Sequence, residues 1–193
     1  MSRALFIGRF QPFHNAHLLD IKKIIKEVDE VIIGIGSSQE KNTLDNPFRY
    51  NERKQMIVNV LGKNKINDYK IYPVPDLYND KKWVRYIKNN LPSYDAVYSG
   101  NYWTLKCFKK FDSRVKKIGL IKGISSTKIR NLMIKDKNWK KLVPEEVADY
   151  IDKIKGVGRI KKIYSNSNSP KQPPLSMLFF LLKLLKQFPL FFS

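Results

Sequence analysis

The sequence predicts an α/β fold, in which a doubly wound sheet of five parallel strands is covered by helices. Short apolar runs recur along the chain, and segments with the periodicity of a helix lie between them. This alternation is typical of parallel strands joined by crossover helices. In 193 residues, of which 42% are hydrophobic, we expect one sizeable core and one globular domain with appendages.

Five short apolar runs are the candidate strands. They are residues 4–8, 31–36, 69–74, 96–99 and 117–121. Runs of this length and composition, each separated from the next by a longer segment, are typical of strands in a buried parallel sheet. We therefore expect five strands in this chain order.

Helical periodicity predicts the segments between these strands. Leu18, Ile21 and Ile25 recur at spacings of three and four, so they share one face of a helix between the first two strands. Pro144 suits the first position of the last helix, because its missing N–H is not needed there. The other expected helices are 50–61, 79–90, 102–111, 126–135 and 144–155.

The globular pattern ends near residue 163, and the chain is expected to divide into a domain (1–163), a linker (164–174) and a tail (175–193). The linker is polar and rich in proline, so it cannot bury a core. The tail is strongly apolar, but Lys183 and Lys186 in its middle disfavour a spanning helix. Three alternatives stay open for the tail: a segment that contacts a membrane surface or a partner, a spanning helix, and a non-native or disordered extension.

The net charge and the cysteine count limit which classes of partner and which cellular compartment are expected. A formal net charge of +20 attracts phosphate, so a nucleic acid, a polyanionic substrate and a simply solvated basic surface are all open. The single cysteine, Cys107, excludes an internal disulfide and a cysteine-based zinc cluster, and we expect it to be a small buried hydrophobe. No signal-peptide pattern precedes the first strand, so the expected location is a reduced cytoplasm.

A first candidate site follows the first predicted strand. Its residues are Gly8, Arg9, Phe10, His14 and His17. A glycine at a strand end lets the backbone approach a ligand, and the free N–H groups of the next helix favour phosphate. His14 and His17 are the only histidines, and their spacing lets both reach one anion. The alternatives are two ordinary histidines, or a zinc site completed by Asp20.

A second candidate site opens the helix after the fifth predicted strand. It contains Ser126, Thr127 and Arg130. Hydroxyl groups here either cap the first helical turn or donate to phosphate, and Arg130 offers a planar fork of donors to two oxygens. Structural capping alone is the alternative explanation of the hydroxyl groups.

The two motifs together resemble the nucleotidylyltransferase superfamily, and Gly-Arg-Phe-Gln-Pro-Phe-His-x-x-His resembles its archaeal-type NMN adenylyltransferase branch. The resemblance implies a Rossmann-like sheet of order 3-2-1-4-5, with the site between strands 1 and 4. It implies catalytic roles for His14, His17 and Arg130. The ATP-binding residues that it implies are Gly8, Arg9, Phe10, His14, His17, Gly100, Asn101, Ser126, Thr127 and Arg130.

The same resemblance implies a pocket for nicotinamide mononucleotide (NMN) after the third strand, formed by Asp76, Asn79, Asp80 and Trp83. In the family the tryptophan stacks on the nicotinamide ring, as cation–π attraction favours. From the residues alone, without the resemblance, Trp83 is interpreted as a core residue on a helix face. The chain departs from the family pattern at Asp80, where asparagine is frequent, and at Asp45, where relatives carry a basic residue.

The implied reaction joins the AMP part of ATP to NMN, giving NAD and pyrophosphate, by direct attack of the NMN phosphate on the α-phosphorus. Mg²⁺ would enter with ATP, without a metal site on the protein, and nicotinate mononucleotide would be a second acceptor. A homo-oligomer, commonly a hexamer, is also implied. The alternatives are a superfamily enzyme acting on phosphopantetheine or an alcohol phosphate, a basic nucleic-acid-binding module, and a regulator tethered to a membrane by residues 175–193.

Overall fold

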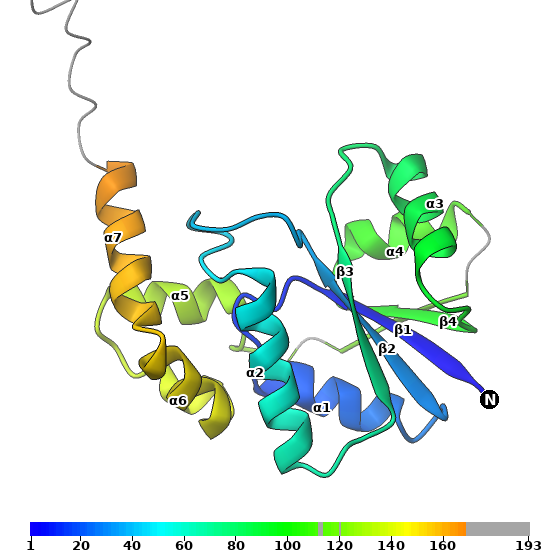
Figure 1. Ribbon diagram of the computed structural model, residues 1–193, viewed down its shortest axis with the longest axis horizontal. Coiled ribbons are helices and arrows are strands. Elements are labelled where there is room, and N and C mark those ends of the chain that lie inside the picture. The colour runs from blue at the N-terminus through cyan, green and yellow to red at the C-terminus, as the bar shows by residue number, and fades with distance from the viewer. Residues whose placement is uncertain (112–113, 120, 169–193) are drawn as a thin grey trace, which may run out of the picture.

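The computed structural model describes residues 1–111, 114–119 and 121–168, which form a five-stranded parallel sheet between two layers of helices (Figure 1). The strands are β1 (Arg3–Gly8), β2 (Glu30–Gly36), β3 (Tyr69–Val74), β4 (Ala96–Ser99) and β5 (Val115–Lys117). Their order, β3-β2-β1-β4-β5, confirms the predicted one. Because the order reverses between β1 and β4, the carboxyl ends of these strands open a crevice.

Seven α-helices and one 3₁₀ turn are present in the described part of the chain. They are α1 (Asn15–Ile24), α2 (Tyr50–Lys63), α3 (Asp80–Asn90), α4 (Tyr102–Lys109), α5 (Ser126–Ile134), η1 (Lys140–Leu142), α6 (Glu145–Lys153) and α7 (Gly156–Asn168). Figure 1 shows α3 and α4 on one face of the sheet and α1 and α2 on the other. The sheet is therefore covered on both faces, as predicted.

The two faces of the sheet have separate hydrophobic cores. In β1, Ala4 and Phe6 pack with α1, α2 and α5, whereas Leu5 and Ile7 pack with α3 and α4. Successive side chains of a strand point to opposite faces, so the continuous apolar runs of β1 and β2 fill both cores. Both strands are thus held from two sides, and their carboxyl ends form a rigid base for a site.

The last strand was predicted at the wrong place. It covers Val115–Lys117 rather than 117–121, and it pairs in parallel with Val97–Ser99 of β4. As an edge strand it tolerates two lysines. The apolar residues that suggested a strand, Ile118 and Ile121, instead line the cavity described below.

The carboxyl-terminal region also differs from the prediction of one helix at 144–155. Lys155 adopts a left-handed backbone conformation (φ 52°), which ends α6, and α7 then begins at Gly156. α7 continues to Asn168, so residues 164–168 are helical where a linker was expected. The rest of that linker and the tail 175–193 lie outside the described residues. In the described ranges, no helix has the length and apolar character needed to cross a bilayer.

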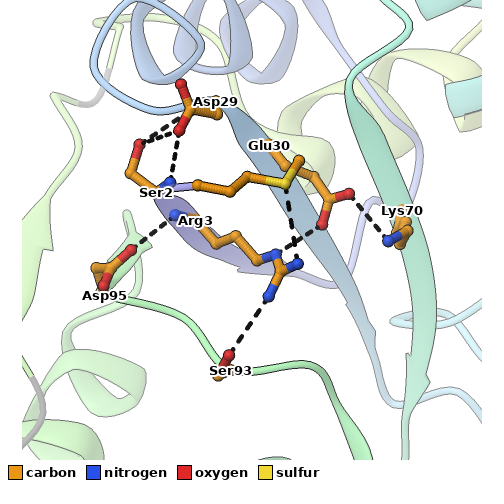
Figure 2. A network of polar contacts seen from close by, with 8 residues as sticks. Ser2, Arg3, Asp29, Glu30, Lys70, Ser93 and Asp95 are labelled. Carbon is orange, nitrogen blue, oxygen red and sulfur yellow. Dashed lines mark hydrogen bonds and ion pairs between the residues drawn. The ribbon is translucent and has the colours of Figure 1, made fainter.

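Ion pairs fix the opposite, amino-terminal edge of the sheet (Figure 2). The carboxylate of Glu30 lies between two cations, with Oε2 3.1 Å from Arg3 Nε and Oε1 3.0 Å from Lys70 Nζ. The backbone N–H of Arg3 donates to Asp95 Oδ2 at 2.7 Å. These contacts join β1, β2, β3 and the turn before β4 at the end of the sheet that is remote from the crevice.

Replacing Glu30 with glutamine should lower stability without affecting chemistry. The change leaves two cations facing a neutral amide at a nearly buried position, and we expect a loss of about 1–2 kcal/mol, less than for a fully buried pair because Arg3 and Lys70 are partly exposed. Thermal unfolding followed by circular dichroism measures it. Asp152→Asn, which breaks an exposed pair with Lys140, is the control and should cost less stability than Glu30→Gln. If both variants lost the same stability, the Glu30 ion pairs would not stabilise the sheet more than an exposed pair does.

Candidate active site

A cavity of about 270 Å³ opens at the carboxyl ends of β1 and β4. It is bordered by the turn after β1, the start of α1, the turn after β4 and the start of α5. All of the residues predicted to bind ATP line it, namely Gly8, Arg9, Phe10, His14, His17, Gly100, Asn101, Ser126, Thr127 and Arg130. The two motifs, more than a hundred residues apart in sequence, therefore meet at one place.

The turn after β1 has a geometry that requires glycine. A Cβ atom on Gly8 would lie 2.9 Å from the ring of Phe10, closer than such contacts allow. Phe10 itself has a left-handed backbone (φ 52°), which folds its ring back over the turn. The ring meets that of His17 edge to face, with centroids 4.8 Å apart. Phe10 is thus a packing residue that orients His17.

The two histidines form a stacked pair at the start of α1. Their ring centroids are 3.5 Å apart, with 13° between the planes. The backbone N–H of His14 donates to Nδ1 of His17 at 3.2 Å, so a neutral His17 carries its proton on Nε2. Burial lowers the pKa of His14 to about 4, and burial together with the charge of His14 lowers the pKa of His17 well below its usual value. Both rings are neutral hydrogen-bond donors in the free protein at pH 7.

These pKa shifts predict a distinctive titration. Because each folded pKa lies below 6.5, protonation favours the unfolded state, and stability is lost as the pH falls from about 6.5 toward 4. In NMR spectra, the ring protons of both histidines should keep constant shifts between about pH 5.5 and 8. The urea-unfolded chain should titrate normally. A native ring that titrates near pH 6.5 would contradict the neutral pair.

Asp20 lies one turn further along α1 and also lines the cavity. It is only 7% exposed, and burial raises its pKa to about 6, although Lys23 acts in the opposite direction. Over residues 1–111, 114–119 and 121–168, no three His, Cys, Asp or Glu side chains are grouped so that they could hold a metal ion. The zinc alternative for His14, His17 and Asp20 is therefore not supported.

The second motif is bonded directly to the first. Ser125, not Ser126, caps α5, by accepting from the backbone N–H of Lys128 at 3.2 Å. This leaves the Ser126 hydroxyl to donate to the carbonyl of Pro12 at 3.1 Å. Arg130 donates from Nη1 to the carbonyl of Gln11 at 3.0 Å. The start of α5 thus holds the loop between β1 and α1 against the cavity.

Arg130 is nearly buried at the cavity wall. Its Nη2 donates to Asp45 Oδ1 at 2.8 Å, so the aspartate that departs from the family pattern is the counter-ion of this arginine. Burial lowers the pKa of Arg130, and Asp45 acts in the opposite direction. The guanidinium therefore stays charged, and an incoming phosphate must compete with Asp45 for it.

The residues predicted to bind NMN are not brought into this cavity. Asp76 follows β3, and the amide oxygen of Asn79 caps α3 by accepting from Lys82 N at 2.9 Å. Trp83 is 3% exposed and packs in the core under α3 and α4. Its ring lies 4.9 Å from that of Trp103, which is 44% exposed. The roles of Asp76, Asn79, Asp80 and Trp83 in binding NMN stay predictions.

The sequence is similar to proteins of known activity over most of its length. The cytidylyltransferase-like family matches residues 5–132. The nicotinamide-nucleotide adenylyltransferase of Methanococcus vannielii is 46% identical over 163 residues, which are 83% of this chain and 94% of that protein. The chain belongs to the nicotinamide-nucleotide adenylyltransferase family. Its Pyrococcus furiosus member is 38% identical over 177 residues, which are 89% of this chain and 94% of that protein.

A solved structure has the same fold as this family member. It is a bifunctional NMN adenylyltransferase/ADP ribose pyrophosphatase from Francisella tularensis, complexed with AMP and a Mn ion. The TM-score is 0.67 at 23% identity, and the match covers 98% of this chain and 57% of that chain. The chain therefore spans little more than half the length of that protein, and the likeness shows the Rossmann-like fold.

Several residues that shape the family site in this chain were not predicted. Gln11 is buried, and its side-chain amide exchanges two hydrogen bonds with the backbone of Phe48, at 2.9 and 3.0 Å. The Ser99 hydroxyl donates to the carbonyl of Ile7 at 3.2 Å and accepts from the N–H of Asn101 at 3.1 Å, which joins β4 to β1. Gln11 lies inside the first motif and Ser99 ends a predicted strand, but the sequence assigns neither a role, because each acts through contacts that only the folded chain creates.

Arg53 is a third residue that shapes the site, and its place in the sequence does indicate a special role. It lies three and four residues before Met56 and Ile57, on the face of α2 that carries the core. An arginine at a core position of an amphipathic helix is unusual, since charged side chains are rarely buried without a partner.

Cys107 behaves as expected: it is buried, and burial together with Asp80 raises the pKa of its thiol to about 11.

Proposed function

We propose that this chain is a nicotinamide-nucleotide adenylyltransferase, which joins the AMP part of ATP to NMN, makes NAD and releases pyrophosphate. The observation that carries the proposal is the convergence of the two phosphate-binding motifs on one cavity at the switch between β1 and β4. Family membership over 94% of the Methanococcus vannielii protein supports the same activity. A nucleic-acid-binding module is not favoured, because it would need no such cavity.

The cavity suits transfer by positioning rather than by covalent catalysis. The NMN phosphate is already an anion and attacks the α-phosphorus of ATP directly, so that the bond to the pyrophosphate oxygen breaks and no protein nucleophile is needed. We assign Arg130 to the pyrophosphate as its charge grows. His14 and His17 donate neutral hydrogen bonds to phosphate oxygens, and Ser126 and Thr127 lie at the N-terminus of α5, where anions are favoured.

A divalent cation fits this scheme as a companion of ATP. The described residues provide no cluster of metal ligands, so phosphate oxygens and water would supply most of the coordination. The Francisella tularensis protein was complexed with AMP and a Mn ion. We propose Mg²⁺ as the ion used with ATP, and its role is to neutralise phosphate charge.

The experiment that tests the function mixes purified protein, ATP and Mg²⁺ with one phosphate acceptor at a time and measures pyrophosphate. NMN should give NAD, and nicotinate mononucleotide should give a slower or equal reaction. Phosphopantetheine and an alcohol phosphate represent the rival members of the superfamily. Pyrophosphate release with one of these acceptors, but with neither pyridine nucleotide, would reject the proposal. Salt-dependent binding of DNA without any pyrophosphate release would favour the nucleic-acid alternative.

Replacing Trp83 with alanine should raise the KM for NMN several-fold and leave the KM for ATP within about twofold, because stacking on the pyridine ring is worth roughly 0.5–2 kcal/mol. Trp83 is 3% exposed and its ring lies 4.9 Å from that of Trp103. The pyridine ring of NMN can therefore stack on Trp83 only if Trp103 shifts. Trp103→Ala is the companion variant. Substrate kinetics of both variants measure the effect. An unchanged KM for NMN in Trp83→Ala would show that Trp83 serves the core alone.

The remaining expectations are proposals about the whole protein. We propose a cytoplasmic homo-oligomer, commonly a hexamer in this family, whose globular domain extends through α7 to Asn168 and is followed by the apolar tail 175–193. A single buried cysteine supports the reducing compartment. The apolar composition of the tail supports contact with a membrane or partner, and liposome co-sedimentation of the full chain tests it.

A further inference from the structure

A buried arginine lies beside the candidate active site without lining it. Arg53 on α2 is 0% exposed and is absent from the cavity wall. Its guanidinium donates three hydrogen bonds, all to backbone carbonyls. Nη1 donates to Arg9 and to Gly36, each at 2.7 Å, and Nη2 donates to Ser37 at 2.9 Å. One side chain therefore bridges the turn after β1 and the turn after β2.

Burying the charge of Arg53 costs more free energy than placing an apolar side chain at the same core position. Among the residues that the structure describes, Arg53 forms no ion pair within 4.0 Å. Burial lowers its pKa to about 10, and the opposing influence of Asp76 acts from beyond contact distance. A well-packed apolar side chain at such a position is often as stabilising as a buried charge. The three directed bonds indicate that Arg53 sets backbone geometry.

The bonds hold two strained turns. Phe10 has a φ of 52° and directly follows the bound carbonyl of Arg9, and Ser37 has a φ of 48° and directly follows that of Gly36. The left-handed conformation is unfavourable for residues with side chains and persists where contacts enforce it. Because the Phe10 ring packs on His17, the hold on Arg9 extends to the phosphate-binding histidine.

The second turn leads to the side of the site assigned to the pyridine nucleotide. The N–H of Ser38 donates to the carbonyl of Val74 at 3.2 Å. The Gln39 amide donates to the carbonyl of Asp76 at 3.2 Å and accepts from its N–H at 3.1 Å. The turn after β2 is thus bonded to the residue proposed to lie at the NMN pocket.

We propose that Arg53 is a positioning residue that couples the ATP-phosphate turn after β1 to the turn after β2, which supports the NMN side of the site. The proposal rests on the proposed function, since only a reaction between two bound phosphates needs this coupling. Direct attack requires the two substrates in one relative geometry, and a misplacement of about 1 Å costs on the order of 10² in rate. Arg53 therefore serves turnover more than the affinity for either substrate alone.

The test compares Arg53→Lys with Arg159→Lys. Lysine keeps the charge but lacks the planar fork that spans three carbonyls. At saturating ATP and NMN, Arg53→Lys should lower kcat at least about tenfold while each KM changes less than about threefold. Arg159 on α7 is the matched control, because it makes a two-pronged pair with Glu52 and contacts neither turn. Arg159→Lys should lower the melting temperature and keep kcat within about twofold.

A second variant distinguishes a positioning role of Arg53 from a requirement for Arg53 in folding. Ser37→Gly removes the strain of the left-handed turn, so in the Arg53→Lys background it should restore part of the stability and of kcat. If Arg53→Lys retains a kcat within about twofold of wild type, the proposal is overturned. Failure of both Arg53→Lys and the double variant to fold would also overturn it, because Arg53 would then be a requirement of the fold.

An NMR measurement keeps this proposal separable from the proposed function. Arg53→Lys should shift the ring signals of His17 through Arg9 and Phe10, and Arg159→Lys should leave them in place. Unchanged His17 signals in Arg53→Lys would reject the coupling whatever the reaction is. A wild-type protein that releases no pyrophosphate from ATP and NMN would instead reject the function, and the His17 spectra would still decide whether Arg53 holds the turn.

Discussion

Replacing Arg130 with alanine should lower turnover by on the order of 10²–10³, equivalent to about 2.7–4 kcal/mol, because it removes a preorganised donor from the charge that grows on the departing pyrophosphate. The arginine is nearly buried, so its interaction with phosphate is poorly screened by water. Its backbone contact with Gln11 already fixes the side chain before ATP binds. Steady-state kinetics at saturating ATP and NMN measure the loss.

Three companion variants identify the origin of that loss. Arg130→Lys should recover only part of the activity, since an ammonium group keeps the charge but cannot donate to Gln11 and phosphate in one plane. Asp45→Asn removes the counter-ion, so the KM for ATP should fall. Arg85→Ala, at an exposed position on α3, should have no effect. Turnover of Arg130→Ala within about threefold of wild type would reject the phosphate site as described.

The second large effect is expected at His17, whose replacement by alanine or asparagine should lower kcat by on the order of 10². The two nitrogens of this ring have different roles in the proposed mechanism: Nδ1 accepts from the backbone N–H of His14, and the protonated Nε2 is the proposed donor to phosphate. Asparagine can supply an acceptor near the Nδ1 position but places no donor at Nε2. His17→Asn should therefore fold and remain slow.

Glutamine provides the complementary variant, because its longer amide places an N–H nearer to the position of Nε2. His17→Gln should be faster than His17→Asn at saturating substrates. Asn15→Ala is the control, since Asn15 lies in the same turn of α1 and donates to the carbonyl of Lys141, away from the cavity. Equal activity of His17→Asn and wild type would remove the histidine from the mechanism.

Much of the fold, and the meeting of the predicted ATP-binding residues at one cavity, could be predicted from the sequence, because both depend on local patterns. β1, β2 and β4 contain continuous apolar runs, β3 is a mixed strand rich in aromatic and β-branched residues, and the two motifs follow β1 and open α5. Parallel strands bring such segments to one edge of a sheet, so short-range signals were enough to assemble a cavity. The prediction failed at β5, where the apolar residues Ile118 and Ile121 form a cavity wall and not a strand.

The features that could not be predicted depend on contacts between distant segments. The burial of Trp83 depends on where α4 places Trp103, and the pairing of Arg130 depends on where the segment before α2 places Asp45. The break between α6 and α7 depends on a left-handed Lys155, a conformation that lysine itself does not favour. Each is decided by tertiary packing, which a single sequence does not display.

The buried thiol of Cys107 has a consequence for the conditions under which the enzyme works. With a pKa of about 11, the thiolate fraction at pH 7 is on the order of 10⁻⁴, and the sulfur is enclosed by the core under α3 and α4. Peroxide and disulfide exchange act on the thiolate, so they find little to attack in this chain. Oxidants that modify exposed thiols elsewhere in the cell should therefore leave Cys107 unmodified in the folded chain.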